Sequence, residues 1–295
     1  MKFIATDPVA VMAAYCSIRD MGKEEALSAM LLDGPPGAGK SFFAKYVSSL
    51  LGGKFMHFQC FPGCGREDLL WDKDAEGKRL PGLLIQALLN SQTEKTVVLM
   101  DELDKADVRI DSFLLNMLQE GFISMPQLAD IAKDGVIKAN PANIIFFFTK
   151  NDQREASSPL MRRCRIIYMD WPSSETEFKI LKAAVPELTM GCFEALMEPV
   201  RRLRENPICK KPPSTPELIR LAKDLAIMAK LDCSHEIIGK YYKLAITQNP
   251  LDRKLVEKAA RYFGLSLKPH FQDAFKDVDL ISSSIIDELV SQIKE

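Results

Sequence analysis

The chain has 295 residues, of which 47% are hydrophobic and 27% charged, and its formal net charge is −1. This length suits one large or two modest domains, and this hydrophobic content suits folded cores. Because acids and bases nearly cancel, the composition provides no long-range field that would steer the chain toward nucleic acid or an anionic membrane. No apolar run reaches the roughly 20 residues of a membrane helix, and the start, with Asp7 and Pro8, lacks the apolar stretch of a signal peptide. The composition therefore predicts a cytoplasmic protein.

Strand-like and helix-like segments alternate through the first two-thirds of the chain, which is the order typical of βαβ units around a parallel sheet. Buried strands are predicted at residues 29–32, 54–60, 96–100, 143–149 and 165–169. Helices are predicted at residues 40–50, 81–90 and 111–120, where apolar residues recur with helical spacing. The pattern therefore predicts an α/β domain with a parallel sheet.

The pattern changes after Trp171 and Pro172, where strand-like runs cease. Helical periodicities follow at residues 175–184, 191–204, 216–230 and 255–263. We therefore predict an α/β domain over residues 1–170 and a smaller, all-helical domain over residues 171–295.

A glycine-rich segment joins the first predicted strand to the first predicted helix. It matches G-x-x-x-x-G-K-[S/T] in full, as Gly34, Pro35, Pro36, Gly37, Ala38, Gly39, Lys40 and Ser41, and Phe42 follows as a further binding position. Glycines let the backbone curl so that N–H groups point at phosphate oxygens, and the helix N-terminus favours an anion. Lys40 adds positive charge near the β and γ phosphates, and Ser41 can hold Mg²⁺. The segment therefore predicts binding of ATP with Mg²⁺.

Asp101 and Glu102 follow the almost wholly apolar strand at 96–100. Strand ends of an open parallel sheet face the ligand crevice, so both carboxylates are expected beside the phosphates. Asp101 is placed to hold Mg²⁺ through its water shell, and Glu102 to polarise the water that attacks the γ phosphate. Asn151, two residues after the strand ending at Thr149, is placed to position that water. The alternatives are an acid pair that caps a helix and an asparagine in a turn.

The seven cysteines show no framework spacing and are predicted to be free thiols. Cys60 and Cys64, with His57 nearby, are conceivable metal ligands, but their spacing matches no standard zinc site.

Four segments occur in the order typical of the AAA+ ATPase family, which the chain resembles over roughly residues 25–225. They are the loop 34–41, the two acids with residues 103–106, residues 146–151 and residues 158–164. Residues 162–172 are similar to the MoxR-like branch of that family. The resemblance implies a three-layer P-loop NTPase domain with a helical lid, ATP between the two, and a ring-shaped homo-oligomer, usually a hexamer. It also implies that Asn151 is the sensor-1 residue and that ATP hydrolysis drives the remodelling of a protein client.

Arg163 resembles the arginine finger of the family, which reaches the γ phosphate bound to a neighbouring subunit. A planar guanidinium suits the charge spread over phosphoryl oxygens, and such a finger is worth ~10³-fold or more in turnover. Arg162 and Arg165 are the adjacent alternatives. A different interpretation is a basic helix end that complements its own dipole.

The predicted lid departs from the family pattern. Residues 214–218, Ser-Thr-Pro-Glu-Leu, lie where relatives usually carry an arginine that senses the γ phosphate. Proline and glutamate occupy the expected places, and Arg220, one turn further along, is the candidate substitute.

Two insert-like stretches are candidates for contact with a client in a central pore, the alternative being that both are surface loops. Residues 61–82 are glycine-rich and charged and include Trp71, which looks exposed, and residues 121–138 are typical of a β-hairpin.

A competing function is that of a DNA-associated AAA+ ATPase, such as a loader or a restriction-type motor subunit. The basic residues that would suit it are Arg201, Arg202, Arg204, Lys210 and Lys211. No aromatic residues interleave with them, so a solvated helix face is favoured. A third function, a scaffold that binds ATP and turns it over slowly, has no need of Glu102.

Overall fold

The computed structural model describes residues 8–132, 134–151, 154–205, 209, 211–230, 241–242 and 245–246 of the chain. The chain divides into two compact units, Met1–Trp171 and Pro172–Glu295. The first unit mixes helices and strands, and the described part of the second is helical.

Five strands form a parallel sheet in the first unit, all at positions that the sequence predicts. They are β1 (Ser28–Asp33), β2 (Lys54–Gln59), β5 (Thr96–Asp101), β8 (Ile144–Thr149) and β9 (Arg165–Tyr168). Their spatial order is β2-β5-β8-β1-β9, and every neighbouring pair is parallel. The interior strands β5 and β8 are covered on both faces, which explains why their sequences are almost wholly apolar.

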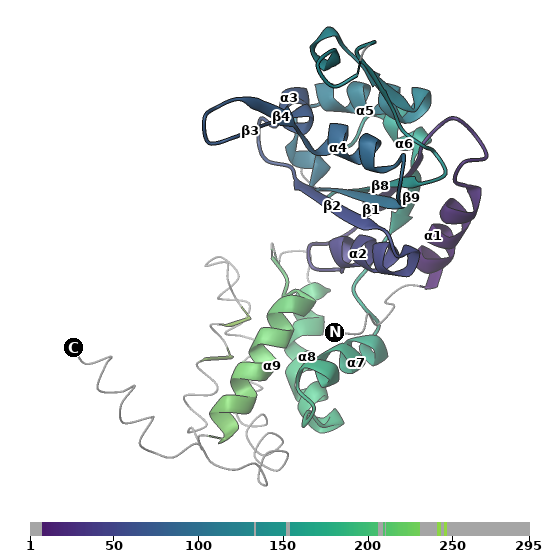
Figure 1. Cartoon of the computed structure of the whole chain (residues 1–295). Coiled ribbons are helices and arrows are strands. Elements are labelled where there is room, and N and C mark those ends of the chain that lie inside the picture. The colour runs from purple at the N-terminus through teal and green to yellow at the C-terminus, as the bar shows by residue number, and fades with distance from the viewer. Residues whose placement is uncertain are drawn as a thin grey trace. The chain divides into compact units, whose positions relative to one another are not determined.

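Helices cover both faces of this sheet, so the unit has three layers (Figure 1). One face carries α1 (Pro8–Asp20) and α2 (Lys40–Leu51), and the other carries α4 (Leu83–Asn90), α5 (Arg109–Glu120) and α6 (Ser158–Arg163). Successive residues of β8 point to opposite faces. Phe147 meets Phe43 of α2 edge to face, with 6.1 Å between ring centroids, whereas Phe146 and Phe148 pack into the core beneath α4 and α5. The sequence did not predict α1.

The two insert-like stretches contain small elements of their own. Within residues 61–82, α3 (Arg66–Leu70) leads into β3 (Trp71–Lys73), which pairs antiparallel with β4 (Arg79–Pro81). The expectation that Trp71 is exposed is wrong. Its ring is partly buried against the core, and the guanidinium of Arg79 lies 5.6 Å from its centroid. Residues 121–138 form the predicted hairpin, β6 (Phe122–Ser124) with β7 (Val136–Lys138), and η2 (Pro126–Leu128) lies between the strands.

The second unit contains α7 (Ser174–Ala184), α8 (Met190–Arg204) and α9 (Thr215–Lys230). These helices share an apolar core that includes Phe193, Leu221 and Tyr242. The predicted helix at 255–263 lies outside the described residues. No helix among the described residues has the length and apolar character needed to cross a membrane.

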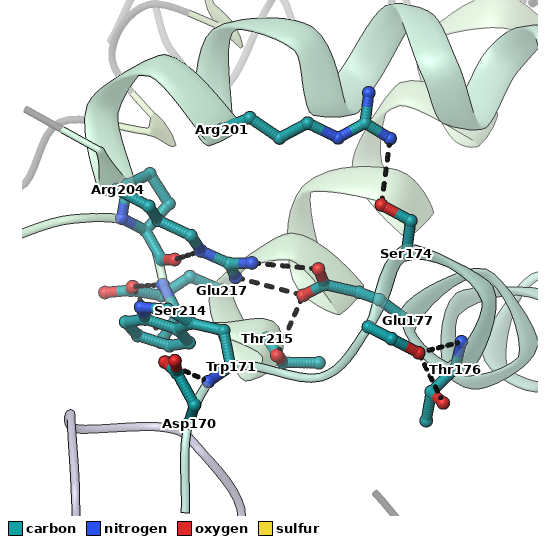
Figure 2. Close-up of polar contacts among 12 residues, drawn as sticks. Asp170, Trp171, Ser174, Thr176, Glu177, Arg201, Arg204, Ser214, Thr215 and Glu217 are labelled. Carbon is teal, nitrogen blue, oxygen red and sulfur yellow. Dashed lines mark hydrogen bonds and ion pairs between the residues drawn. The ribbon is translucent and has the colours of Figure 1, made fainter.

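A buried ion pair joins α7, α8 and α9 (Figure 2). Arg204, at the end of α8, donates to both carboxylate oxygens of Glu177 on α7 at 2.8 and 3.0 Å. Its Nε donates to the backbone oxygen of Pro213 at 3.0 Å, and the hydroxyl of Thr215 on α9 donates to Glu177 at 2.9 Å. Every polar atom of this Glu177 carboxylate is therefore bonded inside the unit.

Candidate functional site

The order of the strands brings three sequence-distant segments to one edge of the sheet. β5, β8 and β1 are neighbours and run parallel, so their carboxyl ends lie side by side. The glycine-rich loop follows β1, Asp101 and Glu102 stand at the end of β5, and Asn151 follows β8. Crevices outside the carboxyl ends of parallel strands are the usual ligand sites of such sheets.

Two glycines with positive φ lie near the two ends of the glycine-rich loop. Gly34 has a φ of 137°, and a Cβ at this position would collide with the backbone oxygen of Met169, so no larger residue fits. Gly39, with a φ of 94°, directly precedes α2. The Lys40 ammonium donates to the backbone oxygens of Gly34 and Pro35 at 2.5 and 3.0 Å and to Oδ1 of Asn151 at 2.9 Å. The loop, its lysine and the predicted sensor residue therefore meet at one point.

Ser41 and Asp101 fit the predicted magnesium site. The Ser41 hydroxyl donates to Oδ2 of Asp101 at 2.8 Å, close to the separation of about 3 Å between adjacent ligand positions around an octahedral Mg²⁺. Thr149 donates to the other carboxylate oxygen of Asp101, and Nε2 of His57 lies 3.6 Å from Oδ2. These contacts fix the rotamer of Asp101. Ser41 and Asp101 would hold the ion, which would neutralise phosphate charge when ATP is bound.

Glu102 has a positive φ of 56°, and every other described residue with a positive φ is glycine. A non-glycine residue in this region is strained, and such strain gathers at functional sites. The backbone N–H of Glu102 donates to the Thr149 hydroxyl at 2.8 Å, and Nδ2 of Asn151 lies 3.4 Å from Oε1. The strained turn thus places the carboxylate beside Asn151.

The other carboxylate oxygen of Glu102 has two donors. Nε2 of Gln59, at the end of β2, donates to Oε2 at 2.6 Å. The ammonium of Lys105, in the short helix η1 (Leu103–Lys105), lies 2.5 Å from the same atom. The hydrogen bond to Glu102 raises the pKa of Lys105 above its ordinary value.

Gln59, Lys105 and Thr149 are site residues that the sequence reasoning missed. Thr149 and Gln59 had a detectable signal, because each is a polar residue at the carboxyl end of a strand in the same sheet. Lys105 had none, because its contact depends on the turn that Glu102 makes. Phe42, predicted as a binding position, is 45% exposed on the first turn of α2.

The structure does not bring the candidate arginines to the phosphate loop of their own chain. Arg162 and Arg163 end α6, which leads directly into β9 at the amino edge of the sheet. The phosphate loop leaves the carboxyl end of the neighbouring β1, and Arg165 lies beside Met30, three residues or roughly 10 Å before that end. Arg162, Arg163 and Arg165 line a cavity of about 470 Å³ at the amino edge. Nε of Arg163 is buried there with no hydrogen-bond partner among the described residues, and Arg162 is exposed.

Cys60 and Cys64 are both buried. Burial raises the pKa of the Cys60 thiol to about 12, which disfavours the thiolate that a metal requires. Within the described part of the chain, no group of three or more His, Cys, Asp and Glu side chains is arranged as a metal site.

The comparisons with known proteins agree with this geometry. Residues 29–164 match the family model described as the AAA domain (dynein-related subfamily). Over these residues the chain is similar to an AAA ATPase domain. The reaction of such a domain is the hydrolysis of ATP, and the match contains the phosphate loop, both acids and Asn151.

Relatives of the AAA domain include Lon proteases. That of Desulforamulus reducens is 24% identical over 266 residues, which are 87% of this chain and 32% of the relative. The peroxisomal Lon protease homolog 2 of Pichia angusta is 31% identical over 145 residues, or 47% of this chain and 15% of the relative. The chain therefore spans a third or less of the length of these relatives.

Among solved structures, a point mutant of Thermotoga maritima RuvB has a TM-score of 0.52 at 17% identity, covering 90% of this chain and 73% of that one. The likeness shows the P-loop NTPase fold. The MoxR-like branch stays a prediction.

Proposed function

We propose that this chain is the ATPase subunit of a ring-shaped, MoxR-like AAA+ motor, most simply a hexamer, that remodels or activates a protein partner. In this proposal residues 1–170 bind ATP with Mg²⁺ and residues 171–295 act as the helical lid. The observation that carries it is the distance between the arginines and the phosphate loop of their own chain, because a neighbouring subunit is then needed to complete the site.

Within one subunit, each polar group at the carboxyl edge of the sheet has a separate task. Lys40 neutralises the β and γ phosphates, and Ser41 with Asp101 holds Mg²⁺. Glu102 accepts the proton of the attacking water or orients it, and the Asn151 amide fixes the water's position. The 3.4 Å separation between Asn151 and Glu102 supports this division, since one water can contact both groups.

The arginine at the amino edge completes the site of a neighbour. Nε of Arg163 is buried with no partner among the described residues, so a neighbour's phosphate would meet the terminal nitrogens of this guanidinium. Arg162, which is exposed, is the alternative finger. Stacking subunits so that one amino edge meets the next carboxyl edge generates a heterologous contact, and such contacts form a ring when the rotation between subunits closes.

A protein client is supported by the loop after β2. Phe61 is 46% exposed on this loop. The backbone N–H of Asp107, just beyond η1, donates to the Cys64 oxygen of the same loop at 3.1 Å. This bond joins the loop to the segment that follows Glu102, and in this proposal it carries movement of the loop to the catalytic turn.

The DNA-associated alternative is weakened by the basic residues of α8. Arg201 pairs with Glu194 at 2.7 Å and Arg202 with Glu198 at 2.7 Å. Arg204 is buried against Glu177. Cations already paired with carboxylates contribute little attraction to phosphates. Lys210 lies outside the described residues.

In the lid, the departure from the family pattern has a structural reason. Glu217 accepts from the backbone N–H and the hydroxyl of Ser214 at 2.8 and 2.7 Å, which supplies the glutamate half of a capping box at the start of α9. These positions serve the helix terminus. Arg220, exposed on α9, is the proposed substitute that senses the γ phosphate.

Mixed rings test the shared site. Arg163→Ala should bind ATP normally and hydrolyse poorly, and Lys40→Ala should fail to bind. Mixing the two inactive variants should restore part of the activity, because some interfaces then combine an intact loop with an intact finger. Absence of recovery from rings shown to be mixed, or full activity in a demonstrated monomer, would exclude the shared site. The same mixture with Arg162→Ala identifies the alternative finger.

A trap variant tests the client. Glu102→Gln should retain ATP binding and lose turnover by about 10²-fold or more, so it should hold a protein partner in pull-downs made with ATP. Glu120→Gln, at the exposed end of α5, is the control. Strong stimulation of the wild-type ATPase by DNA, with no protein captured, would favour the DNA-associated alternative.

A further inference from the structure

The first unit contains a buried ion pair outside the groups described so far. Arg154 follows Asn151 by three residues, and Asp111 lies in the first turn of α5. The two side chains form a fork, with guanidinium nitrogens 2.8 and 3.1 Å from the two carboxylate oxygens. Asp111 has a side-chain exposure of 1% and Arg154 of 21%.

The same guanidinium also bonds to the turn after Glu102. Arg154 donates to the backbone oxygen of Leu103 at 3.2 Å and to that of Ala106 at 3.1 Å. These two carbonyls lie in and directly after η1, which begins with the residue following Glu102. Arg154 thereby holds the backbone of the segment that follows Glu102.

Asp111 extends the contact to α6. Its Oδ2 accepts from the backbone N–H of Ser157 at 2.6 Å, and α6 begins at the next residue. α6 ends in Arg162 and Arg163. The pair therefore contacts three segments: α5, the turn that follows Glu102, and the start of α6, which ends in Arg162 and Arg163.

Stability alone is a poor reason for this arrangement. Taking both ions out of water opposes their mutual attraction, and apolar residues of similar volume often replace such a pair without loss. A rigid fork with fixed bond directions is better suited to positioning. The pair sits where α6 needs a fixed placement if Arg163 is to reach another subunit.

We propose that Arg154, held by Asp111, is a positioning residue that fixes α6 so that Arg163 reaches the γ phosphate of the neighbouring subunit. This inference rests on the proposed finger. Arg154 acts through Arg163, and its loss therefore damages the site of the neighbour more than the site of its own chain.

The experiment uses Arg154→Lys in the full chain, since lysine keeps the charge but cannot form the fork. We expect ATP affinity to stay within about threefold and turnover to fall about tenfold or more, a part of the ~10³-fold that a finger contributes. Mixing with Lys40→Ala should restore activity, because intact fingers then meet intact loops. Mixing with Arg163→Ala should not, because both variants lack a working finger.

Four results overturn the inference. Normal turnover of Arg154→Lys removes any positioning role. Recovery with Arg163→Ala but not with Lys40→Ala shows that Arg154 acts on Glu102 of its own chain. Failure of Arg163→Ala to complement Lys40→Ala removes the finger and this inference with it, whereas success of that mixture without recovery for Arg154→Lys removes the inference alone.

Two further variants separate positioning from structural damage. Asp111→Asn breaks the pair from the other side and should give the same asymmetric complementation, so the test stands even where Arg154→Lys folds poorly. Arg204→Lys is the matched control, because Arg204 forms the same kind of fork with Glu177 in the second unit and is at least as buried as Arg154. It should lower the melting temperature and should not show recovery with Lys40→Ala together with failure with Arg163→Ala. The same pattern of recovery in Arg204→Lys would contradict a specific role for Arg154.

Discussion

Lys40 brings a full positive charge to a loop whose other groups are backbone dipoles. Lys40 as a whole is only 6% exposed, and its ammonium contacts oxygens of Gly34, Pro35 and Asn151. Phosphate oxygens carry negative charge and these oxygens are neutral, so the ammonium is attracted more strongly to phosphate. Nucleotide phosphates should therefore draw the lysine toward themselves.

Lys40→Ala should consequently lower ATP affinity by about 100-fold or more, since it removes the charge that the phosphates meet. Titration with a fluorescent ATP analogue measures the loss. Lys45→Ala, on the exposed side of the same helix, is the control and should bind as the wild type does. An unchanged affinity of the Lys40 variant would contradict the assignment of the phosphate loop.

Among the elements, the interior strand β8 has the most complete burial, with all six of its residues buried. Phe147 has no exposed surface and contacts Phe43 of α2. Phe147→Ala leaves a cavity between the sheet and this helix, so it should lower the free energy of unfolding by about 3–5 kcal/mol. Urea unfolding measures it. Tyr168→Ala on the edge strand β9, where the side chain is 63% exposed, should change the value by less than about 0.5 kcal/mol.

A loss at Phe147 no larger than at Tyr168 would mean that the helix layer does not rest on β8. The measurement thus tests the three-layer packing, which the sequence predicted only in part. Each strand was predictable because a short apolar run between turn residues specifies it locally. The order β2-β5-β8-β1-β9 was not, because it depends on pairing between residues far apart in the chain.

α1 was missed at the same scale for a related reason. Its buried residues include Ala10, Ala13 and Ala14, which are small and give a weak apolar stripe, while Met12 and Tyr15 on the same helix are exposed. The recurrence of apolar residues at helical spacing was therefore hard to detect in this segment. The strained turn at Glu102 was equally invisible, because only the contacts of Gln59, Thr149 and Lys105 reveal it.

On the scale of the whole molecule, each apolar cluster of the described residues lies within one of the two units. The two clusters on the faces of the sheet contain residues of the first unit alone. The third cluster, which includes Leu181, Phe193 and Tyr242, belongs to the second unit. A domain with its own core is expected to fold by itself.

A fragment of residues 1–171 should therefore fold cooperatively. It holds both clusters of the sheet and also Lys40, Ser41, Asp101 and Asn151, so it should bind a fluorescent ATP analogue in a way that Lys40→Ala abolishes. Urea unfolding followed by circular dichroism should give one transition with a slope of about 1–3 kcal/mol per molar urea, as for other single domains. A broad, non-cooperative transition would show that the core of the first unit needs the second. Cooperative folding without nucleotide binding would place essential binding groups in residues 172–295, and the lid would then be part of the site itself.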